Sequence, residues 1–371
     1  MTTFLKLLFL TILCCLCLCP TSSQAQSITI TGKLHNGLDT LILLKPFEDF
    51  RYNGVRIPTN PDSTFSYTFV ADGVEQYQLI HSSEVRDGSW RDVPFFTDAA
   101  KIHFDLFGKT DFASNRITGS ESTNLLNDIE PALMQHWMPA IQEIESQRAS
   151  LPTDVMEKRQ NDLIAKAAHW ELDYTKDYPV AVRISRFYTM VDRYKDQPVM
   201  FPLLKKQHLY RQQQDVDSEL LQVATIKYEA IRANKTSQRF VDFFLITNPT
   251  DSTRLADLIA EHKYTVLDLW SPWCGPCIRK SRELKEHYEW LSARGIAVIG
   301  VLGGVDSAEK YQKAKERHPY PWPVYPEISD HQSIWLRYGL EYSGGQQVVI
   351  DQSGKIVARN PSFRELRALV K

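Results

Sequence analysis

Cysteine is scarce in this chain of 371 residues, and its placement is uneven. Only Cys274 and Cys277 lie outside one apolar stretch near the N-terminus, which holds the other four, Cys14, Cys15, Cys17 and Cys19. A chain with one close pair of cysteines has no framework of structural disulfides. The pair in "SPWCGPC", residues 271–277, therefore needs an explanation of its own.

Several other features are missing, and each absence excludes a class of protein. The formal net charge is −2, so no basic excess indicates a nucleic-acid partner. The sequence has no internal repeat and no low-complexity tract, and its heptad pattern is too broken for a coiled coil. With 43% hydrophobic and 24% charged residues, the composition is that of a globular protein with two or three domains.

The first 25 residues differ from the rest. Lys6 is followed by an apolar run over 7–19, and the small residues Ser23 and Ala25 stand at −3/−1 spacing. This pattern predicts a signal peptide cut after Ala25, and hence export to the periplasm or cell envelope. The run is shorter than the about 20 residues of a membrane span. A retained N-terminal anchor is the alternative.

A lipid anchor is not favoured. A lipoprotein signal needs a small residue directly before the acylated cysteine, whereas Leu16 precedes Cys17 and Leu18 precedes Cys19.

Residues 26–118 have the period-2 alternation of strands. In "TFSYTFV", for example, Phe65, Tyr67 and Phe69 alternate with Ser66 and Thr68. With turns such as "HNGLD", the pattern predicts antiparallel strands with one buried face, arranged as a small β-sandwich or barrel.

Residues 119–237 change to helical spacing, as in Leu125, Ile129, Leu133 and Trp137. Ser122 or Thr123 is expected to cap that helix, and a further helix is expected to begin near Pro179. We interpret this region as a packed spacer or scaffold. A partner-binding face is the alternative.

Residues 238–371 alternate continuous apolar strands with helices, which indicates an α/β sheet covered on both faces. Strands are predicted over 264–270, 295–302, 346–351 and 355–359, and helices over 275–293, 307–317 and 362–370 with Ser362 as a cap. The chain as a whole is predicted to be multidomain: an all-β sandwich, a helical region and an α/β domain.

The cysteine pair lies between a strand and a helix. This places Cys274 at a helix N-terminus, where unpaired N–H groups and the helix dipole favour a thiolate, with Arg279 and Lys280 nearby. Pro276 suits the first helical turn. Cys277 is within disulfide reach, so that an exposed thiolate could attack while a shielded thiol resolves. A solvated helix face is the alternative for the two basic residues.

Three rival interpretations of the pair are weaker. A structural zinc site needs four ligands, and no second cysteine pair is available. Covalent haem attachment needs histidine directly after the second cysteine, where Ile278 stands. A purely structural disulfide stays possible, but closing so short a loop stabilises a chain by only about 2 kcal/mol. We therefore expect a redox-active disulfide with no metal and no other cofactor.

Residues 240–371 resemble the thioredoxin superfamily, specifically exported TlpA/ResA-like thiol–disulfide oxidoreductases. The resemblance rests on "VLDLWSPWCGPC", "IAVIGV", "WPVYPEISD", "RYGL" and "VVIDQSGKIV". More weakly, the β region followed by "ITGSESTN" and helices resembles the N-terminal half of exported redoxin-domain proteins.

The resemblance implies roles for particular residues. Cys274 attacks, Cys277 resolves, and Asp268 assists proton transfer at the resolving thiol. An aspartate in an apolar strand should have a raised pKa, although a carboxylate bonded to backbone at a strand end is the alternative. Substrate contacts are expected from residues beside the sulfurs, Trp273, Gly275, Pro276, Gly344 and Gly345, while Trp270 is expected in the core.

Two positions depart from the family pattern. Arg282 replaces the proline that usually kinks the helix, so we expect the helix to run straighter. Gly345 replaces the cis-proline that faces the sulfurs. A cis bond before a non-proline residue costs about 3–4 kcal/mol, so we expect a trans Gly344–Gly345 bond, a looser loop and weak activity on generic disulfides. Gly345→Pro is expected to raise activity if the fold accepts a cis bond.

The sequence thus predicts an exported thiol–disulfide oxidoreductase. Its Gly-Pro spacer resembles that of reducing members, which indicates protein disulfides as substrates and a membrane thiol-relay protein as electron donor, because the periplasm is oxidising. The alternative is a binding or scaffold protein with a degenerate redox domain.

Overall fold

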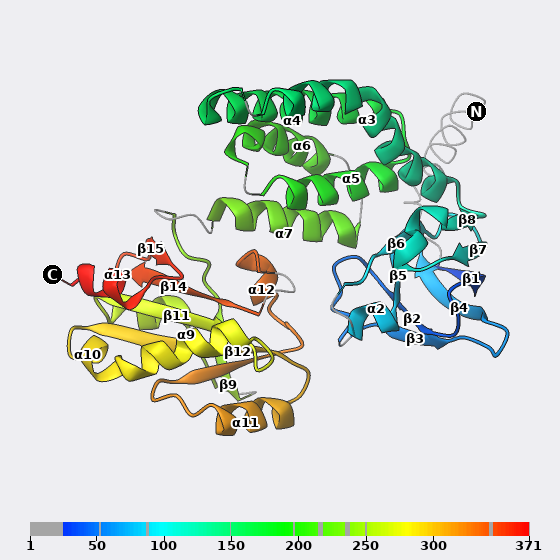
Figure 1. Cartoon of the computed structure of the whole chain (residues 1–371). Coiled ribbons are helices and arrows are strands. Elements are labelled where there is room, and N and C mark those ends of the chain that lie inside the picture. Colours follow the sequence, from blue (N-terminus) through cyan, green and yellow to red (C-terminus); the bar gives the residue numbers. More distant parts are fainter. Residues whose placement is uncertain are drawn as a thin grey trace, which may run out of the picture. The chain divides into compact units, whose positions relative to one another are not determined.

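The computed structural model describes residues 25–370, apart from 52, 87–88, 149, 196, 214–217, 234–237, 249–250 and 341–343. These residues form two compact units, one ending at Ser185 and the other beginning at Arg186 (Figure 1). The boundary falls inside the predicted helical region. The predicted signal peptide lies outside the described residues, except for Ala25. Within the described part of the chain, no helix combines the length and apolar character that crossing a membrane requires.

The first unit begins with two four-stranded sheets. One has the order β4-β1-β7-β8 and contains β1 (Ala25–Leu34), β4 (Thr64–Asp72), β7 (Lys101–Leu106) and β8 (Arg116–Thr118). The other has the order β3-β2-β5-β6 and contains β2 (Thr40–Leu44), β3 (Val55–Pro58), β5 (Gln76–His81) and β6 (Val93–Phe96).

The two sheets share one core, as expected of a sandwich. Ile28, Phe65 and Phe104 of the first sheet pack in the same cluster as Leu41 and Phe95 of the second. The predicted alternation along these strands is confirmed by their burial. The expectation of purely antiparallel pairing was wrong, because β1 and β7 are parallel neighbours. Side-chain alternation reports which face is buried and carries no information on strand direction.

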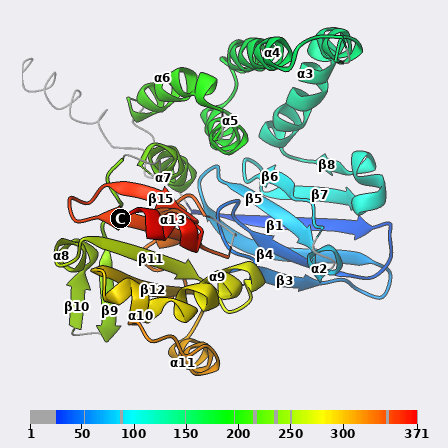
Figure 2. The ribbon, with the colours of Figure 1, turned by 60° about the vertical axis from the view of Figure 1, so that its left-hand side comes forward.

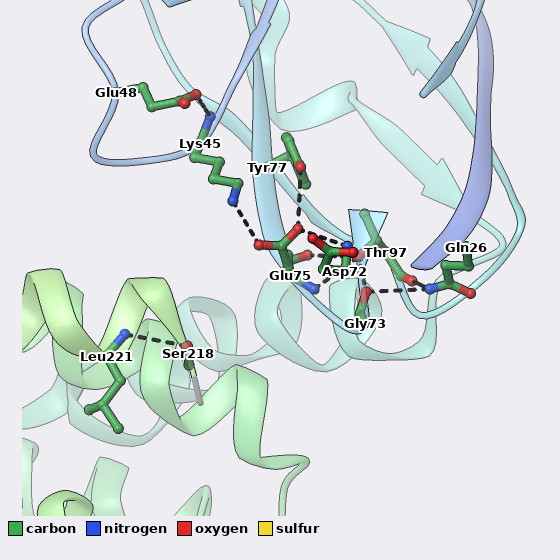
Figure 3. Close-up of polar contacts among 10 residues, drawn as sticks. All are labelled: Gln26, Lys45, Glu48, Asp72, Gly73, Glu75, Tyr77, Thr97, Ser218 and Leu221. Carbon is green, nitrogen blue, oxygen red and sulfur yellow. Dashed lines mark hydrogen bonds and ion pairs between the residues drawn. The ribbon is translucent and has the colours of Figure 1, made fainter. Parts of the chain in front are cut away.

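Polar contacts fix the turn between β4 and β5 (Figure 3). The Glu75 backbone N–H donates to Thr97 Oγ1 at 2.8 Å, and that hydroxyl lies 2.9 Å from the Gly73 carbonyl oxygen. The Glu75 carboxylate accepts from Lys45 Nζ at 2.7 Å and from the Tyr77 hydroxyl at 3.3 Å. Burial, with the adjacent Glu75 carboxylate, raises the pKa of Tyr77 to about 12. This turn is therefore held by side chains as well as by backbone pairing.

Helical segments lie between the strands and after them. Within the first unit these are α2 (Ser82–Arg86), η1 (Lys109–Ser114), α3 (Glu121–Ser146) and α4 (Thr153–Tyr174), followed by α5 (Val180–Arg193), which crosses the unit boundary. Helices α3 and α4 lie side by side (Figure 1). The start of α5 directly after Pro179 agrees with the prediction.

The predicted cap of α3 was wrong. Ser120 is the N-cap, and its hydroxyl accepts from the Thr123 backbone N–H at 3.1 Å. Ser122 and Thr123 are buried in the first turn instead, and Thr123 Oγ1 accepts the Phe96 N–H of β6 at 2.9 Å. The sequence offers several hydroxyl residues, and only the tertiary contact with β6 selects among them.

The second unit contains η2 (Pro198–Met200), α6 (Phe201–Gln212) and α7 (Glu219–Ala233) before its α/β part. The Ser218 hydroxyl accepts the Leu221 backbone N–H at 3.4 Å at the start of α7 (Figure 3). Helix α7 packs against α12 (Ile334–Arg337) of the α/β part.

The α/β part is built on a five-stranded sheet in the order β13-β12-β11-β14-β15. Its strands are β11 (Tyr264–Trp270), β12 (Ile296–Val305), β13 (Val324–Ile328), β14 (Gln346–Asp351) and β15 (Ile356–Arg359). Strands β11, β12 and β13 are parallel, whereas β14 and β15 are antiparallel to their neighbours. A hairpin of β9 (Phe244–Asn248) and β10 (Asp251–Arg254) precedes the sheet.

Both faces of this sheet are covered, as predicted. Val266 and Val298 pack in one cluster with Leu284 of α9 (Gly275–Glu286) and Leu291 of α10 (Tyr288–Ser292), while Leu267 and Leu269 pack on the other face. Helix α9 contacts β11, and α10 contacts β12 (Figure 2). The helices of this part are α8 (Leu255–Ala260), α9 (Gly275–Glu286), α10 (Tyr288–Ser292), α11 (Ala308–Arg317), α12 and α13 (Phe363–Ala368).

The helix predicted over 275–293 is two helices, because His287 leaves helical geometry at φ −113° and ψ 7°. Its ring stacks on Phe363 of α13 with centroids 3.5 Å apart. The predicted cap of α13 is confirmed, since Ser362 and Glu365 form a capping box.

Candidate active site

Cys274 and Cys277 lie where β11 leads into α9. Cys274 is the N-cap of α9, and its Sγ accepts the Cys277 backbone N–H at 3.3 Å. Pro276 lies in the first turn, where no helical N–H is lost. The two cysteines form a disulfide with an S–S distance of 2.01 Å and a Cα–Cα distance of 5.3 Å. The helix terminus therefore contacts Cys274 in the way the sequence predicts.

The expected difference in exposure between the two cysteines is reversed in the disulfide form. Cys274 is 8% exposed, while Cys277 is only partly buried. The cause is Gly344, whose backbone lies against Cys274 so closely that an added Cβ would be 2.2 Å from its Sγ. The sequence could not show this contact, because it depends on how the segment before β14 packs.

Asp268 is a buried carboxyl group at the centre of the sheet, 1% exposed, with β12 and β14 on either side. Its Oδ2 accepts from Ser281 Oγ at 2.7 Å, and its Oδ1 accepts from Gln347 Nε2 at 3.1 Å. Burial raises the pKa of Asp268 to about 6, against the opposing effect of these hydrogen bonds and of Lys280. The bonds to side chains do not support the alternative of a carboxylate tied to backbone.

Ser281 and Gln347 were missed from the sequence. Ser281 lies one helical turn beyond Cys277, and Gln347 stands opposite Asp268 in the register of β11 and β14. Both are buried, at 0% and 3% exposure. Two signals were available in the sequence. Gln347 is a polar residue in the apolar strand "QQVVID", and Ser281 lies on the same helix face as Cys277.

The buried charge makes stability depend on pH. The folded pKa of Asp268 lies above the unfolded value near 3.8, so the native state binds more protons between these values and its stability falls as pH rises from about 4 to about 6. This loss of stability amounts to about 3 kcal/mol, and Asp268→Asn should not show it, because asparagine does not ionise. In denaturant titrations of the oxidised proteins, we expect the unfolding free energy of the variant to rise relative to that of the native protein as the pH increases from 4.5 to 7.5. Parallel curves for the two proteins would contradict the raised pKa.

Other predicted site residues surround the disulfide. Trp273 is 44% exposed, and Gly275 and Pro276 are exposed as well, so these three form an accessible rim. An added Cβ on Gly304 would lie 2.6 Å from Trp273 Nε1, which shows how closely this ring approaches the backbone of β12. Trp270 is fully buried, as predicted.

Gly345 has a trans peptide bond before it, as expected, since no peptide bond among the described residues is cis. Its φ of +145° is in a range that favours glycine, and an added Cβ would be 2.0 Å from the Leu269 carbonyl oxygen. Gly345→Pro was expected to raise activity only if the fold accepts a cis bond, and this conformation does not meet that condition, since proline fixes φ near −65°. The two glycines permit close backbone packing against Cys274 and β11.

The basic residues of α9 differ in their surroundings. Helix α9 continues unbroken through Arg282, as its lack of proline suggested. Arg279 is exposed, whereas Lys280 Nζ donates to the Asn360 carbonyl oxygen at 2.9 Å. Lys280 therefore links α9 to the residue that follows β15, and its positive charge also acts on Asp268.

No group of three or more histidine, cysteine or acidic residues that could hold a metal ion occurs in the described part of the chain.

Comparison with known proteins identifies the C-terminal region. Residues 236–359 match the AhpC/TSA family. This region is therefore similar to that family. The match covers about a third of the chain and does not extend to the β-sandwich or to the helices before it.

Solved structures similar to this chain align with partial coverage. One is the thioredoxin domain of a thiol-disulfide oxidoreductase from Bacteroides vulgatus, with 22% identity, a TM-score of 0.33, and coverage of 37% of this chain and 99% of that one. Another is a putative thiol:disulfide interchange protein DsbE from Chlorobium tepidum, with 23% identity, a TM-score of 0.30, and coverage of 36% and 92%.

A thioredoxin-like protein from Bacteroides caccae aligns over 56% of this chain and 83% of its own, with 12% identity and a TM-score of 0.33. No curated protein matches the chain.

Proposed function

We propose that this protein is an exported thiol–disulfide oxidoreductase that reduces protein disulfides through Cys274 and Cys277. The observation that carries the proposal is the disulfide at the N-terminus of α9, with Cys274 Sγ accepting the Cys277 N–H and a buried carboxyl group linked to the same helix through Ser281. The similarity of residues 236–359 to the AhpC/TSA family supports this chemistry.

The reaction balances as two exchanges. In the reduced protein the Cys274 thiolate attacks a substrate disulfide, forming a mixed disulfide and releasing one substrate thiolate. The Cys277 thiol then loses its proton and attacks Cys274 Sγ, which forms the intramolecular disulfide and releases the second substrate thiolate. Two electrons have moved to the substrate, and a dithiol donor must return them.

Asp268 is the proposed acceptor of the Cys277 proton. With a pKa raised to about 6, its carboxylate is largely ionised at neutral pH and is a stronger base than an ordinary aspartate. It is linked to α9 through Ser281, whose hydroxyl also lies 3.1 Å from the Cys277 carbonyl oxygen. The raised pKa supports a role in proton transfer.

Asp268→Asn should slow resolution of the mixed disulfide while leaving its formation nearly unchanged, because only the resolving thiol needs the base. General-base catalysis contributes about 10²–10⁴-fold, which sets the expected size of the defect. Stopped-flow traces of a single turnover separate the two steps. Equal slowing of both, or of neither, would make Asp268 a structural residue.

Export and partners are part of the same proposal. The pattern of residues 1–25 supports secretion to the periplasm or cell envelope, where a reductase needs an electron donor, for which we propose a membrane thiol-relay protein. The proposed substrates are protein disulfides.

The second candidate is a binding or scaffold protein with little redox activity. The observation that favours it is the Gly344 backbone against Cys274, which leaves the proposed nucleophile 8% exposed in the disulfide form. Reduction of insulin with dithiothreitol as electron source separates the candidates. A rate no higher than that of dithiothreitol alone would reject the reductase and leave the scaffold.

A further inference from the structure

Ser281 lies between two hydrogen-bond acceptors inside α9. It is fully buried, and its Oγ is 2.7 Å from Asp268 Oδ2 and 3.1 Å from the carbonyl oxygen of Cys277. A hydroxyl group has one hydrogen and can also accept, so Ser281 can donate to only one of these oxygens at a time. The choice between them depends on the protonation of Asp268.

Two arrangements satisfy the same heavy-atom positions. When Asp268 is ionised, Ser281 donates its hydrogen to Oδ2. When Asp268 is protonated on Oδ2, the carboxylic acid donates to Ser281 Oγ, and the serine hydrogen turns to the Cys277 carbonyl oxygen. In both cases Gln347 Nε2 donates to the other carboxyl oxygen at 3.1 Å. Neither protonation state leaves the buried carboxyl group without partners, which would be costly.

We propose that Ser281 is a positioning residue that lets Asp268 gain and lose a proton in place during the resolving step. The proposal rests on the proposed oxidoreductase function and adds a residue to it. The proton comes from the Cys277 thiol, and the resulting thiolate attacks Cys274 Sγ while the bond from Cys274 to the substrate sulfur breaks. Only the hydroxyl hydrogen of Ser281 has to rotate, and the heavy atoms of the buried chain keep their positions.

Other groups near Asp268 do not duplicate this arrangement. Lys280 of α9 favours the ionised carboxylate. Tyr320, before β13, has a buried hydroxyl group near Ser281 and Asp268; burial raises its pKa, and the interaction with the Ser281 hydroxyl opposes that rise. Arg282 acts on Tyr320 and on His318, whose ring lies edge-on to Trp270 at 5.7 Å. Strand β12 presents Gly300 to Asp268, with no side chain to contribute.

The competing explanation is that Ser281 serves the helix alone. Serine hydroxyls commonly bond the carbonyl four residues earlier, and Ser281 has that relation to Cys277. A purely helical role would leave the titration of Asp268 unchanged on substitution. The proposal instead requires that titration to shift, because the donor to the carboxylate is lost.

The test uses the whole protein with Ser281→Ala and two companions. Ser281→Thr keeps the hydroxyl group. Ser271→Ala is the matched control, since Ser271 is equally buried but its Oγ has no hydrogen-bond partner among the described residues. The first readout is the pKa of Asp268 in the oxidised protein, followed through its carboxyl carbon by NMR. The second is release of thionitrobenzoate from a mixed disulfide on Cys274, measured against pH.

Ser281→Ala should raise the pKa of Asp268 by about one unit, because the hydrogen bond that it loses is stronger to the charged carboxylate than to the neutral acid. Thionitrobenzoate release should then slow roughly tenfold or more below the shifted pKa and recover at higher pH, as the base ionises again. Ser281→Thr should restore the native profile, and Ser271→Ala should match the native protein.

An unchanged Asp268 titration in Ser281→Ala, or an equal shift in Ser271→Ala, would overturn the proposal. A release rate lowered equally at every pH would also do so, since it would indicate a structural defect. Absence of insulin reduction by the native protein with the Asp268 shift intact would reject the reductase function alone. The carboxyl titration needs no substrate, so the two failures are distinguishable.

Discussion

Cys274→Ser is expected to reduce insulin-reducing activity to the rate of dithiothreitol alone. Cys274 is the N-cap of α9, and its Sγ accepts the Cys277 N–H at 3.3 Å, a contact that stabilises a thiolate in the reduced protein. Cys277 is inside the first turn and lacks this position. Serine keeps the capping oxygen, so the fold should persist while the nucleophile is lost.

Cys277→Ser is the matched variant and should behave differently. Its Cys274 can still attack a disulfide, but the mixed disulfide cannot be resolved within the chain. Non-reducing gels and mass spectrometry should therefore show trapped partners for Cys277→Ser and none for Cys274→Ser.

Alkylation of the reduced native protein near pH 6 should label Cys274 first, although the disulfide form exposes it little. Preferential labelling of Cys277, or trapping by Cys274→Ser, would reverse the two assignments.

Gly345→Ala should destabilise the α/β part of the second unit by about 2–6 kcal/mol. About 1–3 kcal/mol comes from a φ of +145° in a residue with a Cβ, and about 1–3 kcal/mol from overpacking against the Leu269 carbonyl oxygen, which the new Cβ would approach to 2.0 Å. Gly345→Pro should be at least as damaging, because its φ is fixed near −65°. Thermal and denaturant unfolding of the oxidised proteins measures both effects.

Gly339→Ala is the control that separates the two causes. Gly339 also has a positive φ, +68°, but an added Cβ would meet nothing within 4 Å. Gly339→Ala should therefore lower the unfolding free energy only by the about 1–2 kcal/mol that the backbone conformation costs. If Gly345→Pro proved as stable as the native protein, or more active, the segment before β14 would have a conformation other than the one described.

Local sequence patterns were sufficient to predict much of the α/β part. Continuous apolar runs such as 264–270 have to be buried on both faces, and hydrophobic periodicity places the helices between them. The spacing in "WCGPC" brings two sulfurs within reach of each other whatever the rest of the chain does. A raised pKa for Asp268 is also expected of a carboxyl group in an apolar strand, and the burial of this residue in the sheet supplies the cause.

What the sequence determined by itself was therefore what depends on neighbours along the chain: the strands, most helices and the redox pair. The partners of Asp268 and the cover over Cys274 were decided by tertiary structure. Gln347 is 79 residues from Asp268, and Gly344 meets Cys274 only because β14 pairs with β11. The parallel pairing of β1 with β7 has the same origin. Contacts between distant segments depend on register and packing, which side-chain periodicity does not encode.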